Sequence, residues 1–431
     1  MTDLSPRVLW LRLFLPFAAG YLLSYLFRTS NAVIGPVLAA DLSLPDHALG
    51  LLTSTYFVTF AAAQIPLGML LDRYGPRRVE AVLLLVAAAG AAVFALAEDL
   101  AGLAWGRALI GLGVSACLMA AFKAFNQWFA PERQAALIGW ILAAGGLGAV
   151  FAAQPLEAAI GLVGWRDVML WLAVVTVAAA AVIGLVVPAR AGAGAAAGGG
   201  EERSGGVPVR AGRAAAAGLA EQFGGGRRVM ASGACWRYAR MVALAIGGFM
   251  AVQGLWVARW LAEVEGLGRP QVAQLLTWLN VGFLFGCLFM GFMTTPLIRR
   301  GFGEARILAV VAAAYVLVFA AINAAAGAGQ GWLWALLAFV YPMCNIAFAI
   351  LSRSLPLALS GRANTALNLA GFVGAFGLQW GMGILVDALR AAGWDAAAAY
   401  RATFALLLLL QAAAVAWMVL AGKMRRDAPL R

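Results

Sequence analysis

Residues 68–78 of the sequence read GMLLDRYGPRR, and they join two long apolar runs, at 48–71 and 79–97. A membrane-spanning helix needs about 20 consecutive apolar residues, and each of these runs is close to that length. A charged loop this short between two such runs predicts a hairpin of two helices that both cross the bilayer. The same alternation of apolar runs and short polar loops continues along the chain on both sides.

The composition supports a membrane protein. Of the 431 residues, 64% are hydrophobic and 12% are charged, whereas soluble globular proteins carry about 25% charged residues. The excess apolar surface must therefore face lipid. We predict an all-α membrane protein with twelve transmembrane helices in two six-helix bundles. The predicted spans are 10–39, 48–71, 79–97, 101–128, 136–160 and 167–188, then 239–262, 271–298, 305–326, 331–352, 364–388 and 402–421.

The chain divides into two halves with a linker between them. Residues 189–235 are rich in Gly, Ala and Arg, a composition typical of a flexible linker. We therefore predict an N-terminal bundle at 1–188, a cytoplasmic linker at 189–235, a C-terminal bundle at 236–422 and a cytoplasmic tail at 423–431.

A weak internal similarity predicts that the two bundles are related by a pseudo-two-fold axis. The sequence LGLLTSTYFV at 49–58 aligns with AQLLTWLNVG at 273–282. Each segment opens a predicted helix that ends in a basic loop, and duplicated halves are common among transporters.

Loop charge predicts the orientation in the membrane. The net charge is +12, from 31 Lys+Arg against 19 Asp+Glu. The excess lies in alternate loops, which should be cytoplasmic together with both termini. We therefore expect the basic loops to lie against the lipid bilayer, and we expect no nucleic-acid partner. We further expect a monomer in a bacterial inner membrane. The basic loops carry Arg73, Arg77, Arg78, Arg133, Arg299, Arg300, Arg306, Arg362, Lys423, Arg425 and Arg426.

Cysteine and histidine usage predicts neither a metal centre nor another cofactor. The four cysteines are scattered without ligand spacing, and His47 is the only histidine. A catalytic triad based on histidine is excluded, and no nucleophile motif is present, so we do not expect an enzyme.

The charged loop resembles the signature loop of the major facilitator superfamily, which reads Gly-x-x-x-Asp-Arg-x-Gly followed by basic residues. The matching positions are Gly68, Asp72, Arg73, Gly75, Arg77 and Arg78, and Pro76 is a departure from the pattern. With the twelve predicted spans and the central linker, the resemblance covers essentially the whole chain. It implies a transporter that works by alternating access.

Physical chemistry gives these positions a gating role. Gly68 would allow close approach of helices where the halves meet, and Gly75 permits a tight turn. Asp72 and the arginines would form charge-assisted hydrogen bonds that hold one gate shut. The alternative is that the arginines only set the topology.

A second resemblance lies in the fourth span. RALIG, at Arg107–Gly111, resembles the Arg-x-x-x-Gly motif of the same superfamily. An arginine inside a span should face the interior of the bundle. We leave open whether Arg107 and Gly111 brace neighbouring helices or take part in coupling.

Cations dominate the charges inside the predicted spans. Arg28, Arg107 and Lys123 lie within apolar runs, while carboxylates away from the signature loop occur only near the outer ends, at Glu157 and Asp387. Ionisable groups in the membrane are candidates for function. Cations without evident acidic partners predict an anionic solute.

Arg28 is the leading candidate for solute binding. It lies about 12 residues, or roughly 18 Å, from the outer end of its span, which places it near the middle of the membrane. Tyr21, Ser24 and Asn31 share its helix face. The segment FRTSNAVIGP also resembles organophosphate transporters, in which the matching arginine binds phosphate.

Further candidates complete a predicted cavity. Lys123 and Asn126 share one face of the fourth span, and Lys123 would contact solute or extend to the membrane surface. Gln253, Asn280 and Asn368 would line the cavity or join helices. Arg259 aligns two turns outward from Arg28, which predicts an outer vestibule or interface position and argues against a two-arginine phosphate clamp.

These features predict a secondary active transporter that moves a small solute, an organic or inorganic anion, by alternating access. One alternative is a transporter of the same superfamily for a neutral metabolite, amino acid or drug, with the arginines in structural roles. The other is a transporter-like membrane sensor.

Overall fold

The structure is a computed structural model that describes residues 6–129, 131–188, 229–325, 331–355 and 357–424, and every regular element in these ranges is a helix. Most of the predicted linker at 189–235 and most of the predicted tail lie outside the described residues. The helix α12 already begins at Gly233, inside the last residues of the predicted linker.

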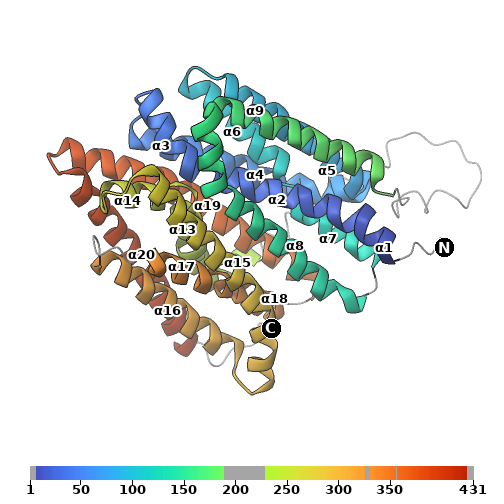
Figure 1. Cartoon of the computed structure of the whole chain (residues 1–431). Coiled ribbons are helices and arrows are strands. Elements are labelled where there is room, and N and C mark those ends of the chain that lie inside the picture. Colours follow the sequence, from blue (N-terminus) through green and yellow to red (C-terminus); the bar gives the residue numbers. More distant parts are fainter. Residues whose placement is uncertain (1–5, 130, 189–228, 326–330, 356, 425–431) are drawn as a thin grey trace, which may run out of the picture.

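The first half begins with one long interrupted helix and continues with packed hairpins (Figure 1). Its elements are α1 (Pro6–Leu9), η1 (Trp10–Phe14), α2 (Leu15–Thr29), α3 (Asn31–Asp41), α4 (Asp46–Tyr74), α5 (Pro76–Leu96), α6 (Leu100–Val114), α7 (Cys117–Trp128), α8 (Pro131–Phe151) and α9 (Gln154–Val186). Gly164, with φ of 83°, kinks α9 between the predicted fifth and sixth spans.

The second half repeats this organisation. Its elements are α12 (Gly233–Met241), η2 (Val242–Ile246), α13 (Gly247–Ala251), η3 (Val252–Trp256), α14 (Val257–Glu263), α15 (Arg269–Arg299), α16 (Glu304–Ala324), α17 (Gly331–Val340), η4 (Tyr341–Asn345), α18 (Ile346–Arg353), α19 (Leu357–Ala391) and α20 (Ala396–Met424).

Within the described ranges, ten helical segments are long and apolar enough to cross a membrane. The predicted spans at 48–71 and 136–160 fall on α4 and on α8 with the start of α9. The all-helical membrane class is therefore confirmed, whereas the count of twelve spans and the cytoplasmic termini stay predictions.

Several helices change geometry near their middles. The chain leaves regular helix between α6 and α7, at Ser115 and Ala116, and passes through π-helical turns at η2 and η3. Pro342 lies in the 3₁₀ segment η4, because proline cannot supply the amide that a continuous α-helix needs. Irregular backbone at membrane depth is tolerated where it is buried in protein or lines a cavity, so these interruptions mark the middle of the molecule.

The two halves meet along the pairs α4–α19 and α8–α15. We call one side of the bundle the basic end, where Gly75 links α4 to α5 and residues 300–303 link α15 to α16. The opposite side is the far end, where residues 42–45 link α3 to α4 and residues 392–395 link α19 to α20.

The halves are closed at the far end and apart at the basic end. A Cβ added to Gly50, near the far end of α4, would lie 2.6 Å from the backbone oxygen of Gln379 in α19. A Cβ added to Gly68, near the basic end of the same helix, would meet no atom of the described residues within 4 Å. The interface therefore opens progressively from the far end to the basic end.

Candidate functional site

A cavity of about 270 Å³ lies between the halves, where the helices change geometry. Residues from α2, α4, α6, α7 and α8 form its wall in the first half, and residues from η2, α13, α15, η4, α18 and α19 form the opposite wall. Discontinuous helices around a central cavity are typical of solute sites in transporters. We call this space the central cavity.

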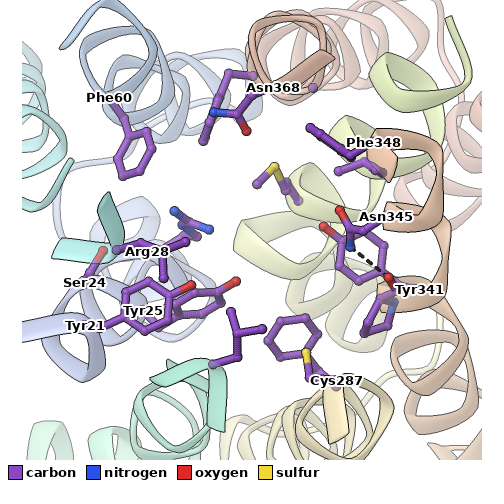
Figure 2. Close-up of a pocket in the computed structure, with 18 of the residues that line it drawn as sticks. Tyr21, Ser24, Tyr25, Arg28, Phe60, Cys287, Tyr341, Asn345, Phe348 and Asn368 are labelled. Carbon is purple, nitrogen blue, oxygen red and sulfur yellow. Dashed lines mark hydrogen bonds between the residues drawn. The ribbon is translucent and has the colours of Figure 1, made fainter. Parts of the chain in front are cut away.

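Arg28 is the charged side chain in the described lining of this cavity. It is 8% exposed, and it reaches from α2 toward the middle of the cavity (Figure 2). Its guanidinium carbon lies 4.6 Å from the ring centroid of Tyr25 and 5.1 Å from that of Phe60, within the range of cation–π contacts. No carboxylate among the described residues forms an ion pair with it.

This environment of Arg28 would suit an anion, whose binding there stays a prediction. A buried charge is costly unless it is paired, and cation–π contacts to two rings offset only part of that cost. The Nε atom of Arg28 has no hydrogen-bond partner among the described residues. A carboxylate, sulfonate or similar group would supply both the missing charge and the missing acceptor.

An aromatic cluster closes the cavity and joins the halves. Tyr25 of α2 stacks on Phe283 of α15 with ring centroids 5.6 Å apart. Phe283 lies 6.0 Å from Tyr341 of η4, which stacks on Phe249 at 3.8 Å. Such ring pairs contribute about 0.5–1.5 kcal/mol each beyond the area they bury. The sequence did not single out Phe283 or Phe249, because an aromatic residue in an apolar span suits lipid and cavity equally.

A second space of about 630 Å³ adjoins the central cavity toward the basic end. The two spaces share Gln64, Met119, Phe348 and Asn368 as lining residues. Lys123 and Gly68 line only the second space, which we call the inner vestibule. Of the predicted solute contacts, Arg28, Ser24 and Asn368 therefore meet in the central cavity, and Lys123 lies on the route to it.

Other predicted solute contacts have protein partners instead. Asn31 donates a hydrogen bond to the hydroxyl of Thr53 and is fully buried. Gln253 donates to Asn280 at 2.8 Å, and Asn280 donates to the backbone oxygen of Ala149 in the other half at 2.8 Å. None of the three lines either space. Their solute contacts stay predictions, and their visible role is to join helices.

Asn126 also lies outside both spaces. It is exposed on α7, although its neighbour on the same face, Lys123, lines the inner vestibule. Its predicted solute contact likewise stays a prediction.

The signature loop has the predicted turn at Gly75. Gly75 ends α4 with φ of 80°, a left-handed conformation that suits glycine. Arg77 donates from Nε to the backbone oxygen of Gly184 in α9 at 2.9 Å, while Arg73 and Arg78 are exposed. The side chain of Asp72 lies outside the described residues, so a latch through that carboxylate stays a prediction.

Arg107 and Gly111 lie inside the first half. Arg107 is 1% exposed and donates from Nη1 to the backbone oxygen of Phe27 at 3.0 Å. Its guanidinium carbon lies 5.4 Å from the ring centroid of Tyr56. A Cβ on Gly111 would lie 2.4 Å from the backbone oxygen of Tyr56. Arg107 thus contacts α2 and α4, and Gly111 lets α6 approach α4 closely, while a part of either residue in coupling stays a prediction.

Ion pairs between the halves close the far end. Arg259 of α14 pairs with Asp46 of α4 at 2.8 Å, and Asp46 is 1% exposed. The Nε atom of Arg259 also donates to the hydroxyl of Tyr400 at 2.9 Å. The geometry agrees with the interfacial position expected for Arg259.

Two further pairs at the far end use the carboxylates that the sequence places there. Arg269 pairs with Glu157 at 3.1 Å, and His47 contacts Asp387 at 2.8 Å through both its ring Nδ1 and its backbone amide. Each pair joins a residue of one half to a residue of the other.

Glu80 is a buried carboxylate that the sequence reasoning missed. It lies in α5 just inside the third predicted span, is 0% exposed, and neither carboxyl oxygen has a hydrogen-bond partner among the described residues. The expectation for carboxylates within the spans covered only those away from the signature loop, so it left Glu80 unconsidered. Its place beside the signature loop disguised it, because a glutamate next to arginines resembles loop sequence.

Curated relatives match parts of the chain. A probable sulfoacetate transporter from Cupriavidus necator is 25% identical over 156 residues, 36% of each chain. A hexuronate transporter from Bacillus subtilis is 30% identical over 137 residues, which cover 32% of this chain and 31% of the relative. The chain thus spans only about a third of the length of these relatives.

Solved structures show the same fold over the whole chain. A bacterial homologue of the human lysosomal transporter Spinster, in an inward-facing and unoccupied conformation, superposes with a TM-score of 0.75 at 18% identity, covering 99% of this chain and 100% of that one. The family model of the Major Facilitator Superfamily matches residues 17–378. The fold, the signature loop and this match agree, and the chain belongs to the Major Facilitator Superfamily.

Proposed function

We propose that this protein is a secondary active transporter that moves a small anion across a bacterial cytoplasmic membrane by alternating access. The observation that carries the proposal is Arg28, a buried guanidinium in the central cavity with no ion-pair partner among the described residues. The named solutes of the relatives above, sulfoacetate and hexuronate, are anions and support the same class. The protein acts as a monomer, without a cofactor.

The transport cycle follows from the two ends of the interface. In this conformation the inner vestibule gives access to Arg28 from the basic end, which the loop charges predict to be cytoplasmic. Rocking of the halves would close the basic end around Gly68 and the signature loop, and would separate the far-end ion pairs. The solute would thus meet one side of the membrane at a time.

The test is transport by purified protein in proteoliposomes, with Arg28→Gln and Arg28→Lys compared with the unmodified chain. Arg28→Gln should abolish counterflow of an anionic substrate, and Arg28→Lys should retain a reduced rate because the charge remains without the planar donor pair. Arg306→Gln, which removes an exposed arginine of α16, is the matched control and should be silent. Unchanged transport of the true substrate by Arg28→Gln would overturn Arg28 as the anion site.

A further inference from the structure

We propose that the central cavity selects a monoanion with an apolar, ring-sized body, and disfavours the hydroxylated sugar acids. This inference rests on the proposed function, because it takes Arg28 as the anchor of the anionic group. It concerns the rest of the solute, which the anchor alone leaves open.

The charge in the cavity fits a single negative group. Arg28 is the charged residue of the described lining, and the nearest lining cation along the same space is Lys123, in the inner vestibule. A second carboxylate beside the first would be desolvated without a cation of its own, which costs several kcal/mol. The cavity therefore favours one negative charge at the Arg28 wall.

Four polar side chains of the lining each donate a hydrogen bond to a backbone oxygen, whereas the hydroxyls of Tyr21, Tyr25 and Tyr341 and the amide of Asn368 also belong to the lining. Ser24 donates to the oxygen of Val114 and Ser115 to that of Leu112. In the same way, Gln64 donates to the oxygen of Ser115 at 3.2 Å, and Asn345 donates to that of Pro342 at 2.9 Å. A solute with many hydroxyl groups would meet four donors that are already used, and each hydroxyl that stays unpaired costs about 1–3 kcal/mol.

Apolar surface makes up most of the remaining wall. Facing Arg28 across the cavity are Tyr341 and Phe348 (Figure 2), and the other apolar side chains include Phe60, Phe283, Phe372 and Met250. Burial of apolar solute surface against them would contribute about 25 cal/mol per Å². The wall opposite the anchor therefore favours a hydrocarbon body over a hydroxylated one.

The volume fits one ring. An apolar protein cavity of about 150 Å³ accommodates benzene, and the central cavity has about 270 Å³. A carboxylate at Arg28 and a ring directed toward Phe348 would fill this space. Phe348 forms no ring pair with another aromatic residue among the described contacts, so its face is open to a solute.

The experiment compares matched solutes on the purified full-length protein, by thermal stabilisation and then by competition in proteoliposomes. The probes are phenylacetate and glucuronate, which are both monoanions, the dianion sulfoacetate, and the neutral benzyl alcohol. We expect phenylacetate to bind at least about tenfold more tightly than glucuronate, which carries the same charge, and than benzyl alcohol.

Two variants test whether the preference for phenylacetate depends on Phe348 and Arg28. Phe348→Leu should weaken phenylacetate by about three- to tenfold while leaving sulfoacetate unchanged, since only the ring contact is lost. Phe302→Leu, at an exposed phenylalanine of the basic end, is the matched control. Arg28→Gln should remove binding of every anion in the set.

The outcomes separate this inference from the proposed function. If glucuronate or sulfoacetate binds as tightly as phenylacetate and still requires Arg28, the preference for an apolar body is overturned and anion transport stands. If benzyl alcohol matches phenylacetate, or Arg28→Gln leaves phenylacetate binding intact, both proposals fall. Absence of binding by all three anions would likewise overturn both.

Discussion

The far end and the basic end of the interface between the halves differ in their contacts. At the far end, opposite charges from the two halves meet, as in Asp46 with Arg259 and Glu157 with Arg269, and glycines such as Gly50 let backbones touch. At the basic end, Lys123 and Gly68 line an open vestibule, and Arg73 and Arg78 are exposed. Ion pairs and close backbone contact join the halves at the far end, whereas a vestibule separates them at the basic end.

The difference shows how one chain can favour the conformation seen here. Ion pairs between halves stabilise a closed far end only as long as the halves stay in contact there. The predicted latch of the signature loop would have to offset them when the basic end closes. Changes at the far end should therefore alter the balance between conformations more than changes in the open vestibule.

The largest effect is expected at Asp46, because its partner Arg259 is 14% exposed and the pair is nearly buried. Asp46→Asn keeps the shape but leaves the guanidinium underpaired, and the loss of one partner of a buried pair costs about 3–5 kcal/mol. Spin labels at Ser43 and Ala392 should report a longer distance between the halves. Glu98→Gln, an exposed carboxylate at the same end, is the control. An unchanged distance distribution would show that the pair does not hold the end shut.

Smaller effects on stability, of opposite sign, are expected from substitutions at two glycines of α4. Gly50→Ala places a Cβ against the backbone of α19 and should lower stability by about 1–3 kcal/mol. Gly68→Ala meets open space and should raise helix stability by up to about 1 kcal/mol. Melting temperatures of the two variants measure this contrast.

Transport by the same two variants sharpens the comparison. Gly68→Ala, and more so Gly68→Val, should slow transport without loss of stability, because the basic end must close at this residue. Full activity of Gly68→Val would contradict closure around Gly68, whatever its melting temperature.

The smallest effect is expected at Glu157, whose partner Arg269 is 52% exposed. Glu157→Gln should cost about 0–1 kcal/mol, as exposed ion pairs do. The exchange Glu157→Arg with Arg269→Glu should restore the original distance distribution, and the effect should shrink in high salt. If Glu157→Gln lowers stability as much as Asp46→Asn does, burial does not determine how much each ion pair of the far end contributes.

The sequence alone determined the membrane class, the superfamily and the position of Arg28. Apolar runs of spanning length leave helices as the solution, because backbone polar groups in lipid must be satisfied within the segment. The turn at Gly75 followed from the motif, and a glycine there adopts a conformation that few other residues reach. Arg28 could be placed because an arginine deep in an apolar run is too costly to face lipid.

Only the tertiary structure decided which polar residues line the central cavity and which form hydrogen bonds with each other. Arg28 and Asn31 are three residues apart in the sequence, yet Arg28 lies in the cavity and Asn31 bonds to Thr53 of α4. Gln253 and Asn280 became partners, and Phe348 became a cavity wall. A sequence shows the chemistry of each side chain, but its partner is set by distances between segments far apart in the chain, which arise only when the helices pack.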